Sequence, residues 1–278
     1  MKSASFFLRV TASFLLTLAF SSIAVAQDRG EGKLDSAEPK GITPAQIIAK
    51  FAAREKQFKL AREQYTYRQQ VTVQTVDDGN VDGEYQMVSD ILFNEKGKRT
   101  EQVVFAPQST LTNISMSRED MDDIENRLPF VLTSDEVSEY SILYVGQQAE
   151  DELQTYVFDI APKQVEKGKR YFQGRIWVDN QDFQIVKTQG ITLPQIRGKN
   201  ENLFPKFTTW RQQIDGQYWF PVYTHADDTL HFKDQDVHIR ETIKYTNYKR
   251  FGSKTKVLFQ GEEVEKAPQQ GQPQPAPK

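Results

Sequence analysis

The sequence, 278 residues long, contains no cysteine. This absence excludes disulfide bonds, cysteine-ligated zinc, cysteine nucleophiles and a lipid anchor on an amino-terminal cysteine. A chain without such cross-links must be held together by a hydrophobic core, and this one is long enough to bury a sizeable core.

The common catalytic motifs are also missing. The sequence has no G-x-S-x-G, no H-E-x-x-H, no P-loop and no G-x-G-x-x-G. Its acidic residues are scattered, and pairs such as Asp122-Asp123 and Asp227-Asp228 are typical of solvated surface. We therefore expect no enzymatic activity and no cofactor, and a hydrolase with an unrecognised site is the last of three readings.

A strong charge of either sign is lacking as well. Lys and Arg number 35 against 38 Asp and Glu, which gives a formal net charge of −3. Proteins that bind nucleic acid carry a basic surface that neutralises phosphates. Nucleic acid is therefore not an expected partner.

The only long apolar run lies at the amino terminus. Lys2 and Arg9 precede residues 10–25, which are apolar apart from Ser and Thr, and Ala24-Val25-Ala26 has the small-x-small pattern of a cleavage site. This pattern predicts a secretory signal peptide over residues 1–26, cleaved after Ala26, and a periplasmic protein. An uncleaved anchor is the alternative. Because no second run follows, we expect the mature chain not to be integral to the membrane.

Composition divides the remainder into three parts. Residues 27–42 are polar, with scattered Gly and Pro, and predict a flexible leader. Residues 260–278 are rich in Gln, Pro and Glu and predict a disordered tail, because they cannot bury enough apolar area to offset their ordering entropy. Residues 43–259 show no internal linker or repeat and predict one domain.

Two helices are predicted. Thr43, Pro44 and Gln46 form a Thr-x-x-Gln capping box with proline in the first turn, and they begin an amphipathic helix over about residues 44–62. Ser117 caps a shorter helix with Asp120 in its first turn. Residues 133–139 add at most one helical turn. The apolar stripes of the two helices consist of Ile47, Ile48, Phe51 and Phe58, and of Met121, Ile124 and Leu128.

Strands account for most of the rest. Alternation of apolar and polar residues predicts a meander of three strands after the first helix, with turns at residues 77–80 and 95–98. Later turn residues separate four strand pairs: 140–148 with 153–162, 170–179 with 183–192, 207–214 with 218–227, and 229–233 with 237–248. The fold class is therefore mainly β (α+β), an antiparallel sheet that carries its helices on one face.

Three histidines lie close together in the sequence. If Asp234-Gln235 is a two-residue turn, His231 faces His238 across a hairpin, and His225 is near. Such a cluster either binds a metal ion or forms a polar pair on an exposed face. We favour the polar pair, and therefore no metal, because no third ligand has the expected spacing.

Aromatic residues are the most informative feature. Phe (18) and Tyr (11) are frequent, and many alternate along predicted strands. They form either an ordinary sheet–helix core or the wall of an apolar cavity that a curved sheet encloses. Periodicity does not separate these two possibilities.

The order of elements resembles a known family. The stretches that carry the resemblance are Tyr144-Val145-Gly146, residues 153–158, Pro162-Lys163, residues 174–179 ending in Trp-Val-Asp, and residues 182–187 ending in Lys187. They are similar to the LolA-like superfamily, in its outer membrane lipoprotein-sorting branch of periplasmic lipoprotein carriers. The resemblance implies a strongly curved antiparallel sheet that forms an incomplete barrel, with two or three helices on its concave face. It also implies binding of a lipid or of lipoprotein acyl chains.

Two functions are therefore weighed against each other. The first is a carrier of lipid or of lipidated-protein acyl chains. The second is an envelope scaffold or sensor that binds a protein partner without a lipid. For the carrier, the candidate residues of the apolar cavity are Phe51, Phe58, Tyr67, Val71, Met87, Ile91, Phe93, Phe105, Met121, Ile124, Leu128, Phe158 and Ile176.

Overall fold

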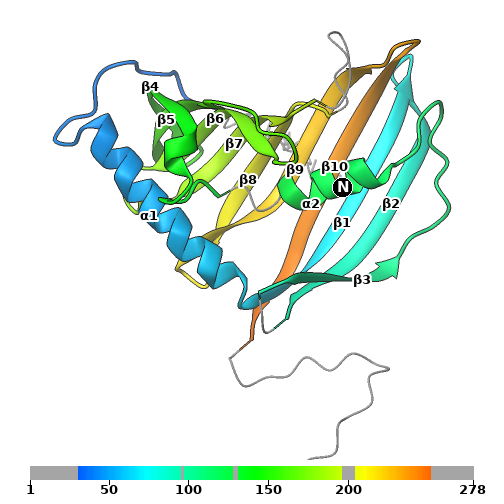
Figure 1. Cartoon of the computed structure of the whole chain (residues 1–278), viewed down its shortest axis with the longest axis horizontal. Helices are drawn as coiled ribbons and strands as arrows, with labels where there is room; N and C mark the ends of the chain where they lie inside the picture. The colour runs from blue at the N-terminus through cyan, green and yellow to red at the C-terminus, as the bar shows by residue number, and fades with distance from the viewer. Residues whose placement is uncertain (1–30, 95–96, 128–130, 196–203, 252–278) are drawn as a thin grey trace, which may run out of the picture.

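The computed structural model describes residues 31–94, 97–127, 131–195 and 204–251. These residues form a single antiparallel sheet of ten strands and two α-helices (Figure 1). The strands are β1 (Tyr65–Asp77), β2 (Asn80–Phe93), β3 (Arg99–Phe105), β4 (Tyr140–Glu150), β5 (Leu153–Pro162), β6 (Tyr171–Asp179), β7 (Ile185–Leu193), β8 (Phe207–Ile214), β9 (Tyr218–His231) and β10 (Asp236–Arg250).

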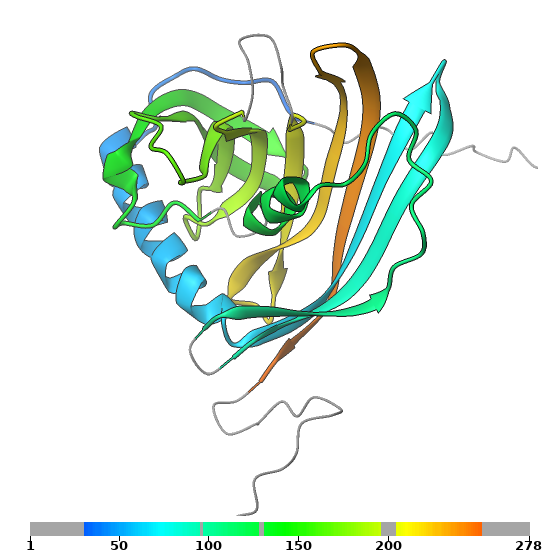
Figure 2. The same ribbon diagram turned by 45° about the vertical axis from the view of Figure 1, so that its right-hand side comes forward.

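The sheet is two meanders joined side by side. Its strand order is β3-β2-β1-β10-β9-β8-β7-β6-β5-β4, so pairing of β1 with β10 joins the first three strands to the last seven. Within the described residues β3 and β4 are the two edge strands and are not hydrogen-bonded to each other. The sheet curves into an open half-barrel around its helices (Figures 1 and 2). This is the architecture that the resemblance implied, and the predicted fold class is confirmed.

Helix α1 (Pro44–Arg62) begins at the predicted capping box. The Gln46 amide donates to Thr43 Oγ1 at 3.3 Å, and the Thr43 amide donates to Gln46 Oε1 at 2.9 Å. Ile47, Phe51 and Ala52 are buried with residues of β4 to β9, including Phe158 and Ile176. The predicted apolar stripe therefore packs against the second meander.

Helix α2 (Arg118–Arg127) lies on the same side of the sheet, over the junction of the two meanders (Figure 2). It begins at the predicted cap, because the Asp120 amide donates to Ser117 Oγ at 3.2 Å and the Ser117 amide donates to Asp120 Oδ2 at 2.7 Å. The single helical turn expected before β4 is η1 (Val137–Glu139). No described helix is long and apolar enough to cross a membrane.

The last hairpin differs from the prediction. Strand β9 runs unbroken to His231, so residues 229–233 are not a separate strand, and the loop comprises Phe232 to Gln235. His231 pairs with Asp236, and His238 pairs with Thr229. The predicted pairing of His231 with His238 is therefore wrong. The Phe232 amide donates to Gln235 O at 2.9 Å, and this bond closes a four-residue loop that shifts the pairing by two residues from the predicted register.

Part of the predicted leader pairs with the edge of the sheet. Residues 31–37, which we call the strap, lie along the end of β4. The Asp35 amide donates to Gln147 O at 2.8 Å, and the Gln147 amide returns a bond to Asp35 O at 2.7 Å. Glycine is required opposite Asp35, because a Cβ at Gly146 would overlap the Asp35 carbonyl. The predicted signal peptide and tail lie outside the described residues.

Candidate functional site

The candidate site is the concave face of the sheet, on which both helices lie. Side chains alternate between the two faces of a strand, and paired residues share a face. Val71 pairs with Ile243 on one side and with Met87 on the other, so these three residues form one row across the concave face. This row runs beneath α2.

The floor beneath α2 is apolar, and α2 itself adds few apolar side chains to it. Val71, Val73, Ile243 and Tyr245 are buried there together with Ile124 of α2. Met121 adds a partly buried contact, and Tyr85 Oη donates to its sulfur at 3.6 Å. Among the described residues of α2, only Met121 and Ile124 are apolar. The apolar contact of this helix therefore rests on two side chains.

The structure divides the predicted cavity residues between two places on this face. Beneath α1 they join a dense core, in which the rings of Phe51 and Phe158 lie 5.7 Å apart. Beneath and beside α2 they lie on or around the apolar floor that this helix covers. The first group comprises Phe51, Phe158 and Ile176, with Phe58 in an adjoining cluster. The second comprises Tyr67, Val71, Met121 and Ile124, with Met87, Ile91 and Phe93 on the same face of β2.

Two predicted residues fall elsewhere. Phe105 pairs with Val88, which points away from the concave row of Met87, and its side chain is 51% exposed. An irregularity in the pairing of β3 between Val103 and Phe105 moves Phe105 to the outer face, a one-residue slip that alternation alone does not reveal. Leu128 lies outside the described residues.

A polar cluster that the sequence reasoning missed borders the apolar floor. Arg99 of β3 donates to Glu101 Oε2 at 3.1 Å and to Gln69 Oε1 at 3.0 Å. Burial raises the pKa of Tyr67, and the neighbouring Arg99 opposes that rise. We call Tyr67, Gln69, Ser89, Arg99 and Glu101 the polar belt. The pairing of Ile91 with Glu101 puts Glu101 on the concave face. The sequence does not reveal this pairing, because a predicted turn does not fix the register of the next strand to one residue.

A buried ion pair fastens α1 to the sheet. Arg211 Nη1 of β8 donates to Glu55 Oε1 at 2.9 Å, and both side chains are almost fully buried. The Arg211 guanidinium also lies over the Phe58 ring. Burial raises the pKa of Glu55, while Arg211 acts in the opposite direction. The pair fixes the helix that covers the dense core.

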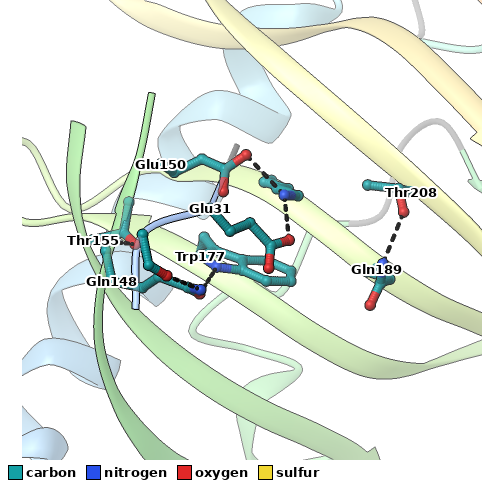
Figure 3. Close-up of polar contacts among 9 residues, drawn as sticks. Glu31, Gln148, Glu150, Thr155, Trp177, Gln189 and Thr208 are labelled. Atoms are coloured by element: carbon teal, nitrogen blue, oxygen red, sulfur yellow. Dashed lines mark hydrogen bonds and ion pairs between the residues drawn. The ribbon is translucent and has the colours of Figure 1, made fainter. Parts of the chain in front are cut away.

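A second ion cluster lies on the outer face (Figure 3). Lys187 Nζ donates to Glu150 Oε1 and to Glu31 Oε1 of the strap, each at 2.7 Å, and lies 4.7 Å from the centre of the Trp177 ring. Trp177 Nε1 donates in turn to Gln148 Oε1 at 2.8 Å. Trp177 neighbours the inward-facing Ile176, so this cluster points away from the helices. It holds the strap against the sheet.

We expect Lys187→Met to lower the free energy of unfolding by about 1–3 kcal/mol, because it leaves Glu150 buried without a donor. It should also make the strap easier to cleave by a protease. Chemical denaturation and limited proteolysis measure the two effects. Glu31→Gln is the control, since Glu31 is partly exposed and its pair should contribute less than about 1 kcal/mol. Equal losses in the two variants would contradict a clamp centred on Glu150.

The histidines do not meet at one site. His238 Nε2 donates a short hydrogen bond to Asp227 Oδ1, Arg240 donates to the other oxygen of that carboxylate, and His231 lies 2.8 Å from Asp236. His238 and Arg240 lower the pKa of Asp227. Within the described residues no group of three or more His, Asp or Glu side chains could hold a metal ion.

Comparison with known proteins gives matches only among solved structures. No family model and no curated protein matches the sequence. A DUF1329 family protein from Desulfovibrio piger is 15% identical, with a TM-score of 0.41, over 76% of this chain and 95% of that one. A LolA superfamily protein from Nitrosomonas europaea is 15% identical, with a TM-score of 0.32, over the same shares.

A third match is the MucA/MucB complex from Pseudomonas aeruginosa. It is 10% identical, with a TM-score of 0.20, over 72% of this chain and 99% of that chain. At these identities and TM-scores, the matches carry no argument about function. The functional argument rests on the residues of this chain.

Proposed function

We propose that this protein is a periplasmic binding and carrier protein for acyl chains, either of lipids or of lipoproteins destined for the outer membrane. The ligand lies on the concave face between the sheet and α2, which acts as a lid. The observation that carries the proposal is the apolar floor of Val71, Val73 and Ile243, which is covered by a helix with only two described apolar side chains.

The energies favour exchange of the lid for a ligand. Full burial of an apolar side chain contributes about 1.5–3 kcal/mol, so the apolar contact of Met121 and Ile124 contributes at most about 6 kcal/mol. A 16-carbon acyl chain gains on the order of 10 kcal/mol when it is buried, before ordering costs. A ligand that displaces α2 from the floor therefore recovers more than Met121 and Ile124 give up.

The test places a charge on the concave face at Phe93, which is only partly buried. We expect Phe93→Glu to fold, because Arg99 lies opposite it and can pair with the new carboxylate. It should lose extraction of a fluorescent fatty acid or lipopeptide from vesicles, because a charged pair there replaces apolar contact with the acyl chain. Ile91→Glu is less suitable, since Ile91 is fully buried and a charge there should also reduce stability. Uptake is measured by fluorescence after removal of the vesicles.

Phe105→Glu is the matched control, because the same substitution falls on the outer face. It should leave extraction unchanged. If Phe93→Glu extracts as well as the unmutated protein, the ligand does not lie on this face. If the unmutated protein extracts neither free fatty acid nor lipopeptide, the carrier proposal fails.

The second candidate is an envelope scaffold or sensor that docks a protein. It is favoured by three consecutive apolar residues on edge strand β3, namely Val103, Val104 and Phe105, each about half exposed. An edge strand with such residues can pair with a strand of another protein. Native mass spectrometry of protein purified from its own envelope separates the candidates: bound lipid supports the carrier, and a bound protein without lipid supports the scaffold.

A further inference from the structure

The polar belt lies on the same face as the proposed acyl-chain site and directly beside it. Gln69 lies two residues before Val71 on β1, and Ser89 lies two residues after Met87 on β2, so both side chains continue the apolar rows on the same face. Glu101 sits beside them on β3, opposite Ile91. The apolar floor is therefore interrupted by a polar group of residues, with Ile91 and Phe93 beyond it on the same face.

The belt contains two buried oxygen atoms without a partner. Ser89 Oγ and Glu101 Oε1 are both inaccessible to solvent and have no hydrogen-bond partner in the described part of the chain. Burying a polar atom without a hydrogen bond costs free energy, and an apolar side chain at either position would avoid that cost. Polar groups kept at such a cost are candidates for recognition of a ligand.

The charge within the belt is already balanced. The Arg99 guanidinium pairs with Glu101 Oε2, and the side chains of Arg99 and Glu101 are 20% and 17% exposed. A carboxylate or phosphate would meet the free oxygen of Glu101, and an ammonium group would meet Arg99. The belt therefore disfavours either sign of charge, whereas a hydroxyl group can donate to the Glu101 carboxylate and accept from the Ser89 hydroxyl.

An exposed side chain lies next to these atoms. Val103 pairs with Ser89 and so shares the concave face, and it is 54% exposed. Ser89 and Glu101 are diagonal neighbours on adjacent strands, a relation that places Cβ atoms roughly 7–8 Å apart. A head group with two hydroxyls spans such a separation better than a single hydroxyl does.

We propose that the polar belt binds the uncharged, hydroxyl-bearing head group of an acyl ligand, with Ser89 and Glu101 as its specificity-determining residues. This inference rests on the proposed function, because it takes the acyl chain to lie on the adjoining apolar floor. Arg99 is a positioning residue: it holds the Glu101 carboxylate through Oε2 and leaves Oε1 for the ligand.

The test compares two esters that have the same acyl chain and differ in their hydroxyl groups. 1-Monopalmitoylglycerol carries two hydroxyls, and methyl palmitate carries none. Each competes with a fluorescent fatty acid that is bound to the full-length mature protein. We expect monopalmitoylglycerol to displace the reporter at about tenfold lower concentration, as a buried hydrogen bond predicts. Free palmitate should compete no better than methyl palmitate.

Two variants locate the preference. Ser89→Ala removes only a hydroxyl and should reduce the ratio between the esters severalfold without changing displacement by methyl palmitate. Glu101→Gln should also reduce it, while Gln102→Ala on the outer face of β3 should not. Equal displacement by the two esters, or an unchanged ratio in both belt variants, would overturn this inference alone. Failure of the protein to bind either a fluorescent fatty acid or a fluorescent lipopeptide would overturn the proposed function and this inference with it.

Discussion

Replacing Arg211 with methionine is expected to lower the free energy of unfolding by about 3–5 kcal/mol at neutral pH. The substitution removes the cation that pairs with Glu55 and leaves that carboxylate at the buried interface of α1 and β8. The loss should exceed that from removing any surface ion pair, such as Lys56 with Asp135. Urea denaturation followed by circular dichroism measures it.

The loss should also depend on pH in a definite direction. Burial already raises the pKa of Glu55 above its ordinary value of 4.5, and loss of Arg211 raises it further. The folded variant therefore binds a proton more tightly than the unfolded chain does, so its stability increases as pH falls through the raised pKa toward 4.5. The difference from the unmutated protein should shrink over that range. Glu55→Leu combined with Arg211→Met should restore most of the stability. The same loss at every pH would contradict this account.

Truncating Phe158 to alanine is expected to cost about 3–5 kcal/mol. Its ring is fully buried, lies 5.7 Å from the Phe51 ring of α1 and 5.5 Å from the Tyr144 ring of β4, and its removal leaves a cavity between helix and sheet. The midpoint of denaturation should shift strongly, with little change in the slope against urea.

Phe105→Ala provides the matched comparison. The sequence pattern assigns Phe105 and Phe158 to the same cavity, but the structure places Phe105 on the outer face, half exposed. Its truncation should change stability by less than about 0.5 kcal/mol. If the two truncations cost the same, the register of β3 described above is incorrect.

Local signals in the sequence predicted much of the fold. The capping residues Thr43 and Ser117 mark the starts of both helices, and the bounds of β5 and β8 agree with the prediction. These features depend on residues close together in the chain, where cap and turn chemistry acts directly. The amphipathic stripe of α1 likewise identified the face that is buried.

The features that the sequence did not reveal depend on contacts between distant segments. The ion pair of Glu55 and Arg211 joins residues 156 positions apart. The strap is polar in composition, yet backbone pairing with β4 and side-chain contacts, including the ion pair of Lys187 with Glu31, fix it to the sheet. The loop at Phe232 was misjudged because turn propensity at Asp234-Gln235 does not indicate the bond from the Phe232 amide to Gln235 O, which closes a longer loop. No local pattern carries such information.

The connection that carries α2 starts at β3 and ends at β4, which are the opposite rims of the half-barrel. On either side of α2 the connection is held in place, since the Thr110 amide donates to Glu84 O at 2.9 Å and the Ser134 amide donates to Ala52 O at 3.1 Å. A lid held on both sides cannot swing out about one hinge. Either one of these attachments is released, or the helix is lifted along its whole length.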